Sequence, residues 1–391
     1  MEPGKRDAPL ITVNNLTFRR SCKMGNICIG GPRMSQQVYS PERADTPQRN
    51  ALHEQTEADI EQNSESMRLQ QKIDDLKPYV SHATGPMKAY GQAAMDRASG
   101  KKTDVSFAQL DAEHLDAMVD VENQRNPDLN LRYFKHHKEF IQALESDGPS
   151  SFRAIYPLTK PRTGQAAKHH VMADVRLTPC EPPSIVITEP GVIVGKRNKQ
   201  LHRHNQTLED LSESGVQLSQ VAIIETQAQK TPDDCVMYCL NYAIKAHKNA
   251  DQFDDIHHGL QRGTLLTESM EGESRTRTTA GTFEEETRYP VVEGDTHVAF
   301  GADVLPVDFY KHGASLTQAL RLMERPDGRM AGRVNSKGHE RAENLVERNQ
   351  AFRISRRELL DEDNPQISQF SASIDGFRLQ EIERVLAAAQ G

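Results

Sequence analysis

The chain of 391 residues has no tryptophan, and only 5% of its residues are aromatic. Its five cysteines are scattered, which excludes the dense disulfide framework of small secreted domains. No apolar run approaches the roughly 18 residues of a membrane-spanning helix, and no basic start followed by an apolar stretch marks a Sec signal peptide. The fifteen histidines show no His-Glu-x-x-His motif, so we expect no metal site. These absences indicate a reduced, cytosolic-type protein.

Acidic residues outnumber basic ones, which gives a formal net charge of −8 and a pI near 6.0. This balance argues against general nucleic-acid binding, because the phosphates of nucleic acids attract basic surfaces. One basic run, from Lys196 to His204, departs from the trend. We interpret it as a solvated loop rather than as a nucleic-acid site.

Composition divides the chain in two. Residues 1–103 are rich in Gln, Ser, Pro, Arg and Glu and have no sustained apolar period, so we predict a disordered secretion and targeting region with a short helix around Ser66–Leu76. Residues 104–391 are long enough for one core of mixed strands and helices. Apolar periodicity predicts two amphipathic helices between Phe107 and Leu144 and three later helices, namely Ser315–Met323, Glu340–Leu360 and Gly376–Ala389.

The segment around Cys235 predicts a strand, a turn and a helix. The stretch Val216–Ile224 ends in an apolar run, and apolar residues after Cys235 recur at helical spacing. N-cap-type residues immediately before Cys235 place the thiol within about one turn of a helix N-terminus, where the helix dipole favours the thiolate. Gln229 and the backbone N–H of Cys235 would together stabilise an oxyanion. The plain alternative is an inert, buried cysteine beside a loop glutamine.

Two further strands are predicted to bring a base and an acid to the thiol. Residues 168–177 alternate with a period of two, so either His169 or His170 faces the thiol, but not both. A second strand runs to Glu189 and stops at Pro190. Paired strands would place the imidazole beside the carboxylate, which fixes its tautomer. Each residue alone is more often structural, but the four required types in this order favour a thiol nucleophile.

This constellation resembles the YopJ family of bacterial type III secreted effectors, in which the order is also His, acid, Gln, Cys, with the Gln six residues before the Cys. The family's Asp five residues after the His selects His169, paired with Asp174, over His170. Further resemblances are the segments 126–132 and 305–312. The resemblance covers about residues 104 to 350. It implies an α+β fold with a papain-like core of the clan of ubiquitin-like-protein proteases (clan CE) and added helical regulatory elements.

The resemblance also implies an activity. Family members transfer acetyl from acetyl-coenzyme A (acetyl-CoA), through the Cys, to Ser, Thr or Lys of host proteins, and inositol hexakisphosphate (IP6) activates them. Lys311 would be the lysine that is acetylated on the enzyme itself. Phosphate contacts would come from Arg125, Arg132, Lys337 and Arg348.

The amino terminus adds a membrane hypothesis. Met24 and Gly25, followed by Cys28, resemble the myristoylated and palmitoylated start of the plant-pathogen HopZ branch of the family. Since an internal glycine is not myristoylated during synthesis, we interpret Met24 as the physiological start. A single acyl chain holds a membrane only marginally, so Cys28 would supply the second anchor. The expected locations are the host cytoplasm and plasma membrane, and the expected partners are proteins of a plant host.

Two other functions are compatible with these residues. The same triad would serve a protease or deconjugating enzyme that acts on ubiquitin-like modifiers. A non-catalytic protein would instead disable a host partner by binding it. The segment around Lys311 and the basic residues near Asn335 favour acetyl transfer, because a protease has no need of an inositol-phosphate site.

Overall fold

The computed structural model describes residues 66–390, apart from 102, 104, 147–150, 159–168, 194–198, 232, 264–295, 336–341 and 359–365. All of the described residues belong to one compact unit, Gln55–Gly391. The residues predicted for lipidation, Gly25 and Cys28, and the predicted phosphate contact Lys337 lie outside the described residues.

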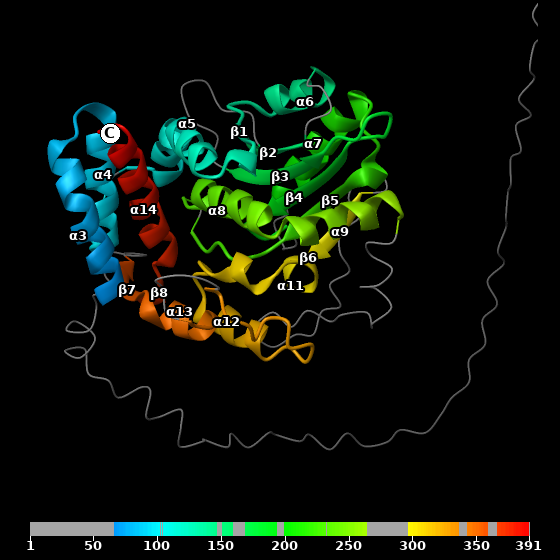
Figure 1. Ribbon diagram of the computed structural model, residues 1–391. Helices are drawn as coiled ribbons and strands as arrows, with labels where there is room; N and C mark the ends of the chain where they lie inside the picture. Colours follow the sequence, from blue (N-terminus) through cyan, green and yellow to red (C-terminus); the bar gives the residue numbers. More distant parts are fainter. Residues whose placement is uncertain are drawn as a thin grey trace, which may run out of the picture. The chain divides into compact units, whose positions relative to one another are not determined.

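A six-stranded mixed sheet forms the centre of this unit, with its strands in sequence order (Figure 1). The β1–β2, β4–β5 and β5–β6 pairs are parallel, and the β2–β3 and β3–β4 pairs are antiparallel. The strands are β1 (Leu131–Tyr133), β2 (Phe152–Pro157), β3 (His170–Arg176), β4 (Ser184–Glu189), β5 (Val221–Glu225) and β6 (His297–Phe300).

Successive side chains of the central strands point to opposite faces of the sheet, and both faces are buried. On β3, Val171, Ala173 and Val175 join one apolar cluster and Met172 joins the other. The expected period of two in residues 168–177 is therefore confirmed. β3 and β4 are buried along nearly their whole length, which is typical of strands covered by helices on both sides.

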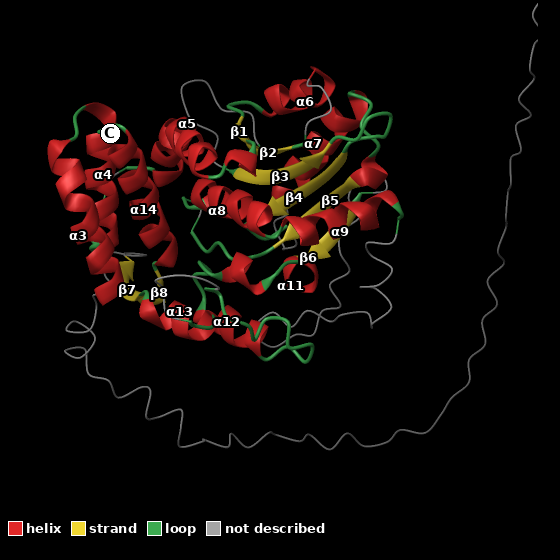
Figure 2. Cartoon of the chain, viewed as in Figure 1, coloured by secondary structure: helices red, strands yellow, loops and turns green. Residues whose placement is uncertain are grey.

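Helices cover both faces of the sheet (Figure 2). The apolar sides of three helices share the cluster that contains Met172. Two others pack with the cluster that contains Val171. The first group is α5 (Phe107–Arg125), α8 (Cys235–Lys248) and α9 (Ala250–Gln261), and the second is α6 (His137–Ser146) and α7 (Lys199–Glu213).

A helical layer adjoins the sheet region on the side of α5. It consists of α3 (Met67–His82), α4 (Gly85–Ala98) and α14 (Ser373–Ala388), which pack against one another (Figure 1). Disorder throughout residues 1–103 is therefore wrong for the described part of that range, and the helix expected at Ser66–Leu76 is longer. Leu69 and the later apolar residues of α3 are buried, because α14 covers them from nearly three hundred residues away.

The remaining elements are short, and all but two of them lie between β6 and α14. They are η1 (Pro127–Leu129), η2 (Leu218–Gln220), α11 (Gly301–Val304), η3 (Val307–Tyr310), α12 (Leu316–Met323), α13 (Leu345–Ala351) and the antiparallel pair β7 (Arg353–Glu358) and β8 (Gln366–Ser371). The helices expected near α12 and α14 are confirmed. A single helix over Glu340–Leu360 is wrong, because the chain after α13 pairs with β8. Among the described helices, none has the length and apolar content needed to cross a bilayer.

Candidate active site

His169 and Glu189 meet where two antiparallel strands end together. His169 immediately precedes β3, and Glu189 is the last residue of β4. The register pairs Met172 with Thr188, which brings the start of β3 beside the end of β4. The Nε2 atom of His169 lies 2.9 Å from both carboxylate oxygens of Glu189. Both side chains are buried.

Cys235 approaches the same imidazole from the helix side. It is the first residue of α8, and its side chain is fully buried in the apolar cluster that contains Met172. The thiol and His169 share a side-chain hydrogen bond. Glu189, His169 and Cys235 therefore form one continuous polar chain that starts at the end of β4 and ends at the N-terminus of α8.

Electrostatics in this chain favour a charged imidazole. Burial disfavours the imidazolium, but the Glu189 carboxylate and the hydrogen bonds to Cys235 and Glu189 together raise the pKa of His169 to about 10. Burial would raise the pKa of Glu189, yet His169 and His204 hold it well below its usual range. An imidazolium beside the thiol stabilises the thiolate, which is the reactive form of a cysteine nucleophile.

The neighbouring histidine occupies a different environment. His170 is buried, and its ring is tilted against Tyr133 with the centroids 6.2 Å apart. Burial and the positive charge of His169 lower the pKa of His170 to about 3, so its ring is neutral at physiological pH. Of the two histidines, His169 is the one that contacts the carboxylate.

A third histidine, His204 of α7, also contacts the acid. Its Nε2 atom lies 3.0 Å from Oε2 of Glu189, and its ring is fully buried. The interpretation of Lys196–His204 as a solvated loop is wrong for the described part of that run, which begins α7. The sequence held a usable signal, because His204, Leu208 and Leu211 recur at helical spacing and all three are buried.

The backbone after β4 completes the surroundings of Glu189. The N–H of Gly191 donates to Oε1 of Glu189 at 2.6 Å. A Cβ atom on Gly191 would lie 2.9 Å from that same oxygen, so a larger residue would press on the carboxylate. The acid is thus fixed by two imidazoles and a backbone donor.

Gln229 lies on the loop between β5 and α8, and this loop is fastened to the end of β4. The N–H of Thr226 donates to the carbonyl of Glu189 at 2.9 Å, and the N–H of Gln229 donates to the carbonyl of Pro190 at 3.0 Å. The side-chain amide of Gln229 donates to the carbonyl of Thr231. The structure therefore places Gln229 on the turn that leads into Cys235, with its amide held toward the backbone of that turn.

Asp174 lies away from the thiol, further along β3. Its carboxylate contacts His257 at 3.1 Å and Arg153 at 2.9 Å. Ser184 in turn lies 2.8 Å from the other ring nitrogen of His257. These buried contacts tie β2, β3, β4 and α9 together, which gives Asp174 a structural position.

A second site is a polar cavity of about 750 Å³ between α14, α5, α8 and the segment around η3. Among the described residues, seven basic and two acidic side chains line it, so its charge suits a polyanion. The basic residues are Lys72, Arg125, Lys245, Lys248, Lys311, Arg348 and Arg384, and the acidic ones are Glu122 and Asp308.

Three of the residues expected to bind phosphate or to be acetylated share this cavity, namely Arg125, Lys311 and Arg348. Arg132 is not among the residues that line it. The Arg132 guanidinium lies over the Phe152 ring, 4.4 Å from its centroid. Sequence reasoning missed Lys72 and Arg384, which come from α3 and α14 at the two ends of the described chain.

A family model described as "YopJ Serine/Threonine acetyltransferase" matches residues 69–384. The chain belongs to this family. Because the match extends from α3 into α14, the helical layer is part of the family's domain. A boundary at residue 103 therefore divides the family's domain.

Individual relatives agree. The chain is 72% identical over 371 residues, which cover 94% of this chain and 100% of the relative, to the serine/threonine-protein acetyltransferase HopZ1a of Pseudomonas syringae pv. syringae. It is 29% identical over 213 residues, covering 52% of this chain and 78% of the relative, to a serine/threonine-protein acetyltransferase of Sinorhizobium fredii.

Solved structures are also similar. A crystal structure of HopZ1a in complex with IP6 and CoA matches with a TM-score of 0.75 and 74% identity, and it covers 83% of this chain and 100% of that one. AvrA delL154 with IP6 and CoA, at 18% identity, matches with a TM-score of 0.57 over 77% of this chain and 97% of that one, and shares the fold. The α+β fold with added helical elements that the resemblance implied is confirmed.

Proposed function

We propose that this chain transfers acetyl groups from acetyl-CoA to Ser, Thr or Lys side chains of host proteins, with Cys235 as the acyl carrier. The observation that carries the proposal is the buried polar chain Glu189–His169–Cys235 at the N-terminus of α8. Membership of the acetyltransferase family and the similarity to HopZ1a, solved in complex with IP6 and CoA, support it.

In the first step, the thiolate of Cys235 attacks the carbonyl carbon of the acetyl thioester. A carbon–sulfur bond to Cys235 forms, the negative charge moves to the carbonyl oxygen, and the carbon–sulfur bond to CoA then breaks. His169 gives its proton to the departing CoA sulfur. The backbone N–H of Cys235 and the amide of Gln229 stabilise the oxyanion, with the dipole of α8 behind them.

In the second step, an acceptor hydroxyl or amine attacks the acetylated Cys235. His169, now neutral, accepts the proton of the acceptor, and the Cys235 thiolate leaves as the carbonyl re-forms. Glu189 keeps the imidazole in place and stabilises its charged form through both steps. The enzyme returns to its starting protonation state.

The polar cavity is the proposed site of IP6, which we propose to activate the enzyme. Its seven basic side chains provide the charge that several phosphates need. Lys311 lines the cavity, and we propose that it is the site of autoacetylation. Acetylation of Lys311 would remove one positive charge from the cavity.

We further propose that the protein is a type III secreted effector that acts inside plant cells. Lipidation of Gly25 and Cys28 would hold it at the host plasma membrane. For the domains, we propose that residues 104–391 carry catalysis together with the α3 and α4 helices, and that the preceding segment directs secretion.

The test is incubation of the purified protein with radiolabelled acetyl-CoA, with and without IP6, beside the Cys235→Ala variant. We expect label on the wild-type chain in the presence of IP6 and none on the variant. Folded wild-type protein without label under any condition would contradict the proposal and favour a deconjugating protease. Retention of the cellular effect by Cys235→Ala would favour a non-catalytic binding protein.

A further inference from the structure

Asp234, the residue immediately before Cys235, has an unusual environment for a helix N-cap. Aspartate at this position normally accepts a hydrogen bond from the first N–H groups of its helix. The carboxylate of Asp234 makes no such bond to α8, and it is buried. Its oxygens are bound elsewhere.

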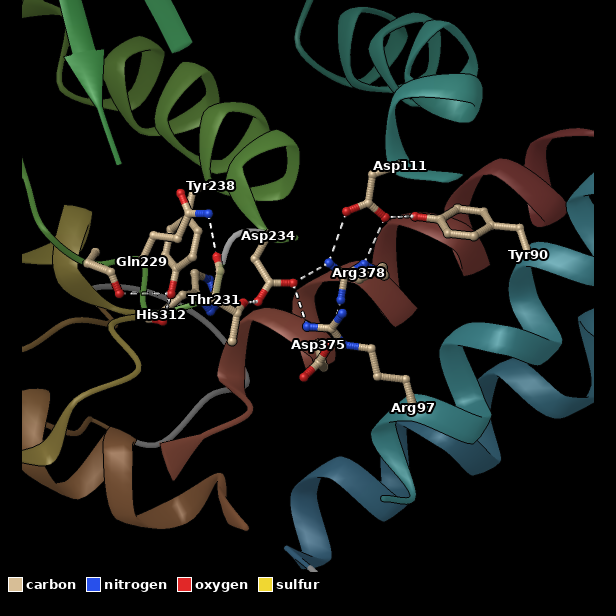
Figure 3. A network of polar contacts seen from close by, with 11 residues as sticks. Tyr90, Arg97, Asp111, Gln229, Thr231, Asp234, Tyr238, His312, Asp375 and Arg378 are labelled. Atoms are coloured by element: carbon tan, nitrogen blue, oxygen red, sulfur yellow. Dashed lines mark hydrogen bonds and ion pairs between the residues drawn. The ribbon is translucent and has the colours of Figure 1, made fainter. Parts of the chain in front are cut away.

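Two arginines hold this carboxylate (Figure 3). Oδ1 of Asp234 lies 2.8 Å from an Nη atom of Arg97 and 2.6 Å from an Nη atom of Arg378. The hydroxyl of Thr231 donates to the other oxygen, Oδ2. In the described interactions, both carboxylate oxygens of Asp234 therefore bind groups outside α8.

Both arginines come from the helical layer rather than from the sheet region. Arg97 belongs to α4 and Arg378 to α14, and Arg378 is almost completely buried. Each also pairs with Asp375, at 2.9 Å and 2.5 Å, respectively. Arg378 makes a two-point ion pair with Asp111 of α5, with both distances at 2.9 Å.

At the end of this network away from Asp234, Asp111 also has a second partner. The Tyr90 hydroxyl donates to Asp111 at 2.6 Å. Because Asp111 has no contact with the loop before α8 among the described interactions, it provides an internal reference. Asp234 and Asp111 are two buried carboxylates that share one arginine, and Asp234 alone adjoins the nucleophile.

The contacts near Cys235 give this arrangement a chemical consequence. An unpaired carboxylate next to the thiol would repel the thiolate and compete for the N–H groups that stabilise an oxyanion. Two adjacent guanidinium groups neutralise the carboxylate and hold it off the helix terminus. The Thr231 contact extends the same restraint to the turn that binds the amide of Gln229.

We infer that Arg97 and Arg378 are positioning residues for the nucleophile: by pairing with Asp234 they keep its carboxylate neutralised and away from the N-terminus of α8. The inference rests on the proposed role of Cys235 as nucleophile. Through these two side chains, α4 and α14 determine the environment of a thiol that they do not contact in the described interactions.

Other titratable groups around the thiol form a constant background. His169 adjoins it from β3, and Glu189 acts through His169 from the end of β4. Cys239 lies one turn further along α8, where burial and Cys235 raise its pKa. None of these three is altered in the variants below.

The test measures the ultraviolet absorbance of the Cys235 thiolate against pH, taken as the difference between each chain and the same chain carrying Cys235→Ala. We expect Arg97→Met to raise the apparent pKa of the thiol by about half to one unit, because the negative charge of Asp234 becomes less well neutralised. We expect Asp234→Asn to lower it, since the negative charge next to the thiol is then removed while both guanidinium groups remain. Arg97→Lys, which keeps the charge, should remain near the wild type.

The diagnostic result is a pKa shift of opposite sign in Arg97→Met and Asp234→Asn. Both variants break the ion pair between Arg97 and Asp234, so they would shift the thiol pKa in the same direction if that ion pair were only structural. Asp111→Asn is the matched control and should move the pKa less than Asp234→Asn. Shifts of the same sign, or no shift, would overturn the inference. If Arg97→Met does not fold, Asp234→Asn tests the inference by itself, because the inference requires the apparent pKa of the Cys235 thiol to fall in that variant.

The titration requires no acetyl transfer, so it separates this inference from the proposed function. Opposite shifts in a protein that transfers no acetyl group would retain the positioning role and contradict the proposed reaction. Where transfer is measurable, Arg97→Met should reduce kcat about tenfold with little change in KM for acetyl-CoA, because misplaced reacting groups cost rate rather than substrate binding.

Discussion

His204 of α7 lies with its Nε2 atom 3.0 Å from Oε2 of Glu189, whereas the N–H of Gly191 donates to the other carboxylate oxygen, Oε1. The Nε2–H of this imidazole donates to the carboxylate. Glu189 therefore orients His169 while being oriented itself by a second histidine. This relationship gives His204 a measurable effect on the proposed reaction.

Replacing His204 with Ala should reduce kcat about tenfold, because a hydrogen bond to a charged group contributes on the order of 1.5–3 kcal/mol. Steady-state acetylation kinetics measure the effect, with KM for acetyl-CoA expected to stay near the wild-type value. His204→Gln, which retains a donor, should recover part of the rate. Unchanged kcat in a folded His204→Ala protein would show that Glu189 needs only the contacts from His169 and Gly191.

Gly191→Ala should also disturb the acid. The added Cβ would lie 2.9 Å from Oε1 of Glu189. Since Cβ atoms in proteins essentially never come that close to another heavy atom, the carboxylate or the loop must shift. We expect kcat to fall by about tenfold, by analogy with other small displacements of catalytic groups. Gly332→Ala is the control, because its Cβ would meet Val307 at an ordinary 3.5 Å. Equal activity of both variants would contradict this prediction.

Two arginines seven positions apart should differ in their effect on IP6 binding. Arg125 lines the polar cavity, whereas the Arg132 guanidinium lies over the Phe152 ring. Arg125→Met should weaken IP6 binding by about tenfold, the equivalent of one charge-assisted contact, and Arg132→Met should leave it unchanged. Isothermal titration calorimetry measures both. A larger loss for Arg132→Met would place the phosphates away from this cavity.

The pair of His169 and Glu189 should make stability depend on pH. The pKa of His169 is raised from 6.5 to about 10, so its contribution is complete below pH 6.5 and is lost as the pH rises toward 10. The pKa of Glu189 is lowered from 4.5, so its contribution is complete above pH 4.5 and is lost in stronger acid. The pair therefore stabilises the fold most between these two ordinary values.

Thermal unfolding of the wild type and of His169→Asn, from pH 5 to 10, measures this dependence. We expect the difference in Tm to be largest near pH 5 to 6 and to shrink as the pH approaches 10. His170→Asn is a control of opposite sign. Because the pKa of His170 is lowered to about 3, its unfavourable effect on stability is confined to pH values below about 6.5, and it adds no pH dependence between about pH 7 and 10. A difference in Tm that is constant across the range would contradict a charged His169.

Local patterns were sufficient to predict the elements that carry the proposed triad. Alternation in residues 168–177 predicted β3, the proline after Glu189 predicted the end of β4, and N-cap residues predicted the start of α8. Each of these signals lies within a few residues of the feature it describes. They also selected the two alternatives, His169 and His170, between which the resemblance and then the contact with Glu189 decided.

Other features depend on segments that meet only after folding. Disorder was predicted where α3 and α4 form, because their apolar residues are few and become a core only when α14 covers them. His204 was missed because its run is basic, and its burial follows from the packing of α7 on the sheet.

The sequence by itself determined the order of the reactive residues and the local elements that carry them, since propensity and periodicity act over short distances. The tertiary structure decided what surrounds them. It forms the polar cavity, to which Lys72 of α3 and Arg384 of α14 both contribute, and it places the two arginines that hold Asp234. Ion pairs between buried groups require geometry that only the packed helices provide, because an isolated charge in the interior is too costly to keep without its partners.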